Sequence, residues 1–122
     1  PSTQTFAKVT PYGARLVGRV DGWLPDYPDA VLEIKTRMSD TNMCFDHEYV
    51  QIQSYLACTG MRRCLFVQHI FHTNTKYALW VHRDESFWGM IEQRLTHAVC
   101  GVQYTIYVLG ALYITWSCAR EK

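Results

Sequence analysis

The chain has 122 residues, of which 48% are hydrophobic, and a net charge of +1 with its histidines neutral. This hydrophobic content excludes a disordered protein, and the length is that of one domain. The charge is lower than that of most proteins that bind duplex DNA non-specifically, so composition neither requires nor excludes a nucleic-acid partner. Five cysteines without regular spacing indicate reduced thiols, and we expect an intracellular protein.

Two strands are predicted in the first third of the chain, at residues 14–23 and 30–36. The segment DYPD between them (residues 26–29) has the composition of a connection between antiparallel strands. Asp21 is therefore expected to return beside Glu33. Alternation along the second strand sends Glu33 and Lys35 to one face and Ile34 to the other, under the core.

Two carboxylates and an ammonium group are thus predicted to converge at the open side of a sheet. Carboxylate oxygens are the hard ligands that Mg²⁺ or Mn²⁺ prefers. An adjacent lysine can stabilise a negative oxygen or assist a water nucleophile. The arrangement of Asp21, Glu33 and Lys35 favours a metal-dependent phosphodiester-cleaving site. The alternative is a strand whose charges simply alternate on a solvated face.

A helix is predicted at about residues 47–58, with Asp46 as its N-cap and Gly60 at its end. Gln51 and Tyr55 lie one turn apart on a shared face. Gln53 lies on a different face and is expected to matter less for turnover. Taken alone, Gln51 and Tyr55 also fit an ordinary polar helix face.

The next two strands, at residues 63–71 and 76–82, are predicted to form a hairpin, followed by a helix at 84–98 that Asp84 caps. The order of elements is strand, strand, helix, strand, strand, helix. This order predicts an α+β fold with a mixed central β-sheet flanked by helices. We assign residues 1–98 to this domain.

Residues 99–122 form a hydrophobic tail of uncertain role. Residues 99–116 carry no formal charge, which makes them a transmembrane candidate at the short end of the range. Their β-branched and aromatic residues suit strands equally well. The sequence leaves both alternatives open, and with them a second candidate function, a small membrane-anchored protein.

Three motifs follow one another in order: Gly18-x-x-Asp21, Glu33-x-Lys35 and Gln51-x-x-x-Tyr55. Together they resemble the PD-(D/E)xK nuclease superfamily, and the third motif resembles its RecB-type branch. The longer strings VQIQSYLACTG and VHRDESF resemble lambda-type exonucleases, the YqaJ viral recombinase family. The resemblance covers residues 16–97.

This resemblance implies a restriction-endonuclease-like core and a role for each matched position. Asp21 and Glu33 would bind Mg²⁺ or Mn²⁺ together with the backbone carbonyl of Ile34. Lys35 would be the catalytic lysine. The remaining two site residues on the helix would be Gln51, which orients the site, and Tyr55.

The resemblance also implies a function and partners. The chain would be a DNA exonuclease acting on linear duplex ends in recombination or repair, possible partners being two further copies in a homotrimer and a single-strand annealing recombinase. The family usually has an N-terminal helical segment, and the sequence starts at Pro1, so we expect a fragment. A catalytically inactive nucleic-acid-binding remnant of the same fold is the alternative.

Two further groups of residues have their own alternatives. Cys44, His47, Cys58 and Cys64 lack the tight paired spacing of structural zinc sites. Arg37, Arg62 and Arg63 are either phosphate contacts or solvated surface arginines.

Overall fold

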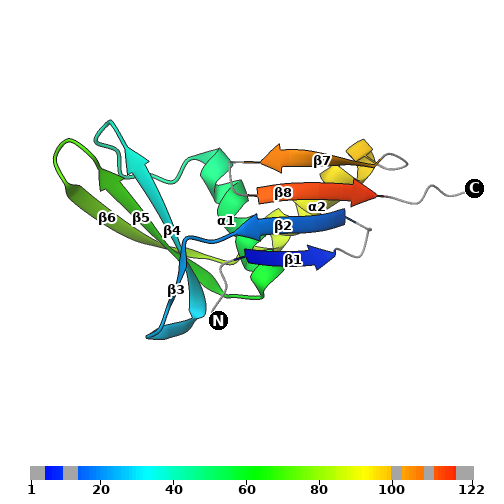
Figure 1. Ribbon diagram of the computed structural model, residues 1–122, viewed down its shortest axis with the longest axis horizontal. Coiled ribbons are helices and arrows are strands. Elements are labelled where there is room, and N and C mark those ends of the chain that lie inside the picture. Colours follow the sequence, from blue (N-terminus) through cyan, green and yellow to red (C-terminus); the bar gives the residue numbers. More distant parts are fainter. Residues whose placement is uncertain (1–4, 10–13, 100–102, 109–111, 118–122) are drawn as a thin grey trace, which may run out of the picture.

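The computed structural model describes residues 5–9, 14–99, 103–108 and 112–117. Its elements form two β-sheets of four strands each, with two helices (Figure 1). In chain order they are β1 (Thr5–Val9), β2 (Ala14–Arg19), β3 (Gly22–Leu24), β4 (Tyr27–Arg37), α1 (Asp46–Thr59), β5 (Arg63–Ile70), β6 (Thr75–His82), α2 (Glu85–Val99), β7 (Gln103–Val108) and β8 (Leu112–Ser117).

The sheet that carries the predicted site has the strand order β3-β4-β5-β6. Strand β4 runs parallel to β5, whereas β3–β4 and β5–β6 are antiparallel. A parallel pair needs a crossover connection, and α1 supplies it between β4 and β5. The predicted α+β architecture with a mixed sheet and helices is confirmed for this part of the chain.

Helix α1 lies at the centre of the molecule, between the two sheets (Figure 1). All residues from Gln51 to Ala57 are buried, because α1 contacts β5 on one side and β1, β2 and α2 on others. The main hydrophobic core lies between α1 and the β3-β4-β5-β6 sheet. It contains Val20, Val31, Ile52, Tyr55, Leu56, Cys64, Phe66 and Val81.

The predicted strand at residues 14–23 is wrong as a single element. This segment forms two strands, β2 and β3, which belong to different sheets. Val20 and Asp21 connect them. Strand β2 pairs with β1 and β8, whereas β3 pairs with β4. Apolar residues occur in the sequence on both sides of this point, and periodicity does not register a change of sheet.

The hydrophobic tail contributes β7 and β8, which complete an antiparallel sheet of order β1-β2-β8-β7. Residues 112–116 pair with residues 14–18, so the two ends of the described chain meet in one sheet. In the part of the chain that the structure describes, no helix is long and apolar enough to cross a membrane.

Element boundaries differ from the prediction by a few residues. The N-cap of α1 is Phe45 rather than Asp46, and the backbone N–H of Phe45 donates to Glu48 Oε1 at 3.0 Å. A glutamate at the third helical position thus satisfies an N–H group without a Ser or Thr cap. Gly60, at φ 75°, ends the helix as predicted. Asp84 caps α2 as predicted, since the Phe87 N–H donates to its Oδ1 at 3.0 Å.

Candidate active site

Asp21 lies at the junction between the two sheets, and two hydrogen bonds tie it to β4. Its backbone N–H donates to the Leu32 carbonyl at 3.2 Å. Its Oδ2 accepts the Ile34 N–H at 2.7 Å. These contacts flank Glu33 on both sides, so the structure brings the Asp21 carboxylate beside Glu33. The break between β2 and β3 is what allows this return.

Glu33 is buried, with 3% of its surface exposed. Burial and a hydrogen bond with the Asp21 carboxyl group raise the pKa of Glu33 from 4.5 to about 8, against the lowering effect of Lys35. Lys35 Nζ lies 3.1 Å from Glu33 Oε2 and keeps 26% of its side chain exposed. The three groups form a carboxylate pair with one cation beside it, open to solvent at Asp21 and Lys35.

The helix residues continue this network. Lys35 Nζ donates to Gln51 Oε1 at 2.8 Å, and Gln51 Nε2 donates to the Tyr55 hydroxyl at 2.7 Å. Gln51 and Tyr55 are both buried. The pKa of Tyr55 is raised above its usual value, mainly by burial and to a smaller extent by the charge of Glu33. The Tyr55 hydroxyl thus accepts a hydrogen bond from the side chain that in turn contacts Lys35. The five side chains Asp21, Glu33, Lys35, Gln51 and Tyr55 form one connected chain.

The donor set suits a hard divalent cation whose shell is completed by other groups. Among the residues with described side chains, no three His, Cys, Asp or Glu gather into one group, so Asp21 and Glu33 are the side-chain ligands on offer. Mg²⁺ typically takes one or two carboxylates and fills its shell with water and phosphate oxygens. Burial and the neighbouring Asp21 raise the pKa of Glu33, and a cation bound beside it would favour its ionised form.

Ile34 enters the cluster through its backbone. Its N–H bonds to Asp21, while the residue is 45% exposed. The expected alternation along β4 holds, with Glu33 and Lys35 on one face and Ile34 on the other. The expected position of Ile34 under the core is wrong, because α1 covers the face that carries Glu33 and Lys35 and leaves Ile34 exposed. The metal-ligand role of the Ile34 carbonyl stays a prediction.

The pair of Arg37 and Glu48 beside the site was not recognised from the sequence, which left Arg37 as either a phosphate contact or a solvated surface arginine. In the structure the Arg37 guanidinium binds Glu48 of α1 with two bonds of 2.7 and 3.0 Å. Arg37 Nε also donates to Gln68 at 2.9 Å. The alternation along β4 could have indicated this position, because Arg37 follows Glu33 and Lys35 at intervals of two residues and therefore lies on the same face of the strand.

Gln53 is on a different helix face from Gln51, as predicted, but that face is also buried. Gln53 Nε2 donates to the His82 carbonyl at 2.8 Å, and its Oε1 accepts the Asp84 N–H at 2.8 Å. Gln53 thus fixes the connection between β6 and α2 to the central helix.

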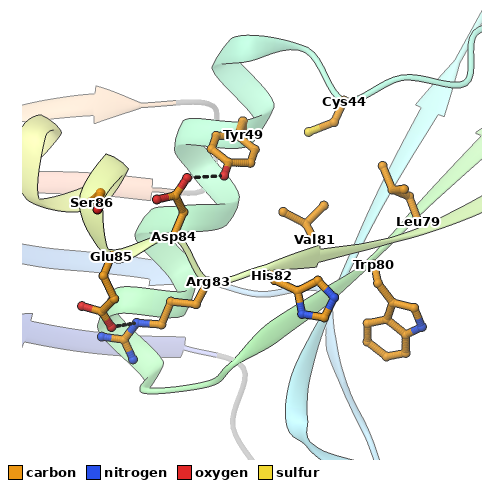
Figure 2. A pocket seen from close by; sticks show the side chains of 10 residues that line it. All are labelled: Cys44, Tyr49, Leu79, Trp80, Val81, His82, Arg83, Asp84, Glu85 and Ser86. Atoms are coloured by element: carbon orange, nitrogen blue, oxygen red, sulfur yellow. Dashed lines mark hydrogen bonds and ion pairs between the residues drawn. The ribbon is translucent and has the colours of Figure 1, made fainter.

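A cleft of about 540 Å³ opens elsewhere, between α1, the end of β6 and the start of α2 (Figure 2). Within it the Tyr49 hydroxyl donates to Asp84 at 2.8 Å, and Arg83 pairs with Glu85 at 2.8 Å. None of the predicted site residues lines it. Its lining consists of Cys44, Tyr49, Leu79, Trp80, Val81, His82, Arg83, Asp84, Glu85 and Ser86.

No model of a protein family matches the sequence, and no curated protein matches it. Two solved structures are similar to the chain. An alkaline exonuclease, LHK-Exo, from Laribacter hongkongensis is 21% identical, with a TM-score of 0.51 over 77% of this chain and 56% of that one. A protein named SSO0001 is 20% identical, with a TM-score of 0.54 over 74% of this chain and 44% of that one.

The chain therefore spans about half the length of each of these structures. Identities this low establish the fold and not the activity. The restriction-endonuclease-like core expected from the three motifs agrees with an exonuclease as structural neighbour. Over the part that is covered, the chain thus shares its fold with this alkaline exonuclease.

Proposed function

We propose that this chain is the catalytic core of a metal-dependent deoxyribonuclease that hydrolyses phosphodiester bonds. The observation that carries the proposal is the connected chain from Asp21 to Tyr55. The exposed Asp21 carboxyl group hydrogen-bonds to the buried Glu33, and the Lys35 ammonium lies 3.1 Å from Glu33. Hydrogen bonds of 2.8 and 2.7 Å continue from Lys35 to Gln51 and from Gln51 to Tyr55. A nuclease as structural neighbour supports the same reading.

Asp21 and Glu33 would hold Mg²⁺ or Mn²⁺, with the Ile34 carbonyl as a further ligand. The bound cation would supply Lewis-acid stabilisation of the phosphate and a more acidic water. Lys35 reaches solvent beside Glu33, where its ammonium would stabilise negative charge on a phosphate oxygen or hold the attacking water. Gln51 fixes the Lys35 ammonium by accepting a hydrogen bond from it, and Tyr55 fixes the amide of Gln51 in the same way.

The test is cleavage of end-labelled linear duplex DNA, with a covalently closed circle of the same sequence beside it. Mg²⁺ or Mn²⁺ should support release of acid-soluble nucleotides from the linear DNA, and EDTA should abolish it. Ca²⁺ should support binding without cleavage. Undiminished cleavage in excess chelator would contradict the metal assignment, and cleavage of both substrates alike would contradict action at ends.

The finer points of the resemblance are part of the same proposal. The substrate would be linear duplex ends processed during recombination or repair, with a homotrimer and a single-strand annealing recombinase as partners. A remnant that binds DNA without cutting it is the other outcome of this test. That outcome would appear as a shift of labelled DNA on a gel with no product at any metal concentration.

A further inference from the structure

Strand β4 and helix α1 are joined by two parallel side-chain bridges, of which the Lys35–Gln51 bond is only one. Two residues further along the same face of β4, Arg37 bonds to Glu48 through both carboxylate oxygens. Glu48 precedes Gln51 by three residues and therefore shares its helix face. Later residues of β4 thus meet earlier residues of α1, so the strand and helix run in opposite directions across these two bridges.

The Arg37–Glu48 bridge is less exposed than the Lys35 ammonium beside it. The Arg37 and Glu48 side chains are 12% and 5% exposed, against 26% for Lys35. Four of the hydrogen-bond donors of the guanidinium are used, since Nε bonds to Gln68 and Nη2 also donates to the Met43 carbonyl at 3.1 Å. The guanidinium carbon lies 4.9 Å from the centre of the Phe45 ring. A group held from so many sides is not available to a substrate phosphate.

Glu48 is held as firmly. Its Oε1 accepts both the Arg37 Nη2 proton and the Phe45 backbone N–H. Burial opposes its ionisation, but the hydrogen bonds from Arg37 and Phe45 lower the pKa of Glu48 below its usual range. The bridge is therefore an ion pair, and it fixes the first turn of α1 and the loop before it to β4.

We propose that Arg37 and Glu48 are positioning residues that set the register of α1 along β4, so that Gln51 meets Lys35. The inference rests on the proposed nuclease function for its catalytic consequence. Apolar packing holds α1 in place but is not directional, so polar bridges select its register. The Lys35–Gln51 bond fixes one point of the helix, and the Arg37–Glu48 bridge fixes a second point three residues away. A shift by one residue would move Gln51 by about 1.5 Å and about 100°.

The first test is Arg37→Lys, which keeps the charge but cannot form the planar two-bond contact. Its single-turnover cleavage rate should fall by roughly 10- to 10²-fold, the scale of a small misplacement at a catalytic centre. The KM for DNA should change little, because Arg37 is already bound to Glu48. In a Gln51→Ala background the same substitution should have no further effect on rate, since its effect passes through Gln51.

Arg63→Lys is the matched control. Arg63 is also an arginine in an ion pair, 3.3 Å from Asp29 Oδ2, and also lies over an aromatic ring, 4.1 Å from that of Trp80. It lies on β5 and its ion-pair partner is on β4. Any effect of Arg63→Lys on rate should be the same with Gln51 and with Ala at that position. Equal, additive effects for Arg37 and Arg63 would overturn the inference.

A second variant separates positioning from stability. Arg37→Met combined with Glu48→Leu replaces a buried ion pair by apolar side chains, a change that often leaves stability intact. A folded double variant that cleaves slowly supports the positioning role, and one that cleaves at the wild-type rate refutes it.

A readout without DNA keeps the inference independent of the proposed function. The side-chain amide of Gln51 donates to Tyr55, so its NMR resonance should be shifted and protected from solvent exchange in the wild type. Arg37→Lys should move this resonance and reduce its protection, and Arg63→Lys should not. If the wild type cuts no DNA but the resonance moves, the function fails and the positioning stands. If it cuts DNA and the resonance does not move, the positioning fails.

Discussion

Two glutamines on α1, two residues apart, have opposite roles. Gln51 and Gln53 are 1% and 0% exposed, so burial does not distinguish them. Gln53 bonds to two backbone groups in the connection between β6 and α2, the His82 carbonyl and the Asp84 N–H. Gln51 joins the Lys35 ammonium to the Tyr55 hydroxyl.

The difference lies in what the partners can do next. The partners of Gln53 are neutral groups, two of the main chain and the Tyr49 hydroxyl, so its contacts close a structural connection. The partner of Gln51 is a cation that contacts a buried carboxylate and still reaches solvent. A buried amide next to a solvent-accessible charge is a candidate for function, and a buried amide bonded to the main chain is part of the scaffold.

The largest effect is expected at Lys35, at the solvent end of the Gln51 network. Lys35→Ala should lower the single-turnover cleavage rate by roughly 10² to 10⁴. DNA affinity should fall far less, because one phosphate contact is a small part of backbone binding. Lys35→Arg should not rescue fully, since a planar fork replaces a compact ammonium. Equal rates for the three proteins, with thermal melts alongside, would reduce Glu33 and Lys35 to a surface pair.

The two glutamines themselves give the sharpest comparison. Gln51→Ala should lower turnover by about 10²-fold, because the Lys35 ammonium loses its acceptor. Gln53→Ala should instead cost about 1–3 kcal/mol of unfolding free energy, since it removes two hydrogen bonds to the connection between β6 and α2. Denaturant melts and cleavage rates of both variants measure the contrast. The same pattern of loss in both would mean that the two networks are not separate.

The pH dependence of stability tests the charge state at the solvent end of the network. In the folded protein without metal the pKa of Glu33 is about 8, against 4.5 unfolded. Between these values the folded state holds a proton that the unfolded state has lost, so stability falls as pH rises through this window. Thermal melts in EDTA should show this fall, and Glu33→Gln should flatten it. Mg²⁺ should also reduce it by favouring the ionised carboxylate. A variant as pH-dependent as the wild type would contradict the raised pKa.

The smallest effect of a substitution is expected in the cleft between α1, the end of β6 and the start of α2. Tyr49→Phe removes the 2.8 Å hydrogen bond to Asp84 and should cost about 0.5–1.5 kcal/mol of unfolding free energy. The cleavage rate should not change, because no site residue lines this cleft. A loss of rate without a loss of stability would make the cleft part of the active site.

Much of the candidate site could be predicted from the periodicity of side chains within single elements. Alternation along β4 placed Glu33 and Lys35 on one face, and the helical repeat placed Gln51 and Tyr55 on another. Both hold in the structure because each depends on residues within one element. The stop at Gly60 and the cap at Asp84 were also local, since they follow from the backbone freedom of glycine and a short carboxylate side chain.

The tertiary structure decided what depends on partners distant in sequence. Residues 14–18 pair with 112–116, and no local sequence pattern predicts a pairing between segments so far apart in the chain. The same reason applies to three other features, which also depend on distant partners: the division of the predicted strand at Asp21, the bridge from Arg37 to Glu48, and the contacts of Gln53 with the connection between β6 and α2. Side-chain period gives the face of an element, but only packing fixes which element covers that face.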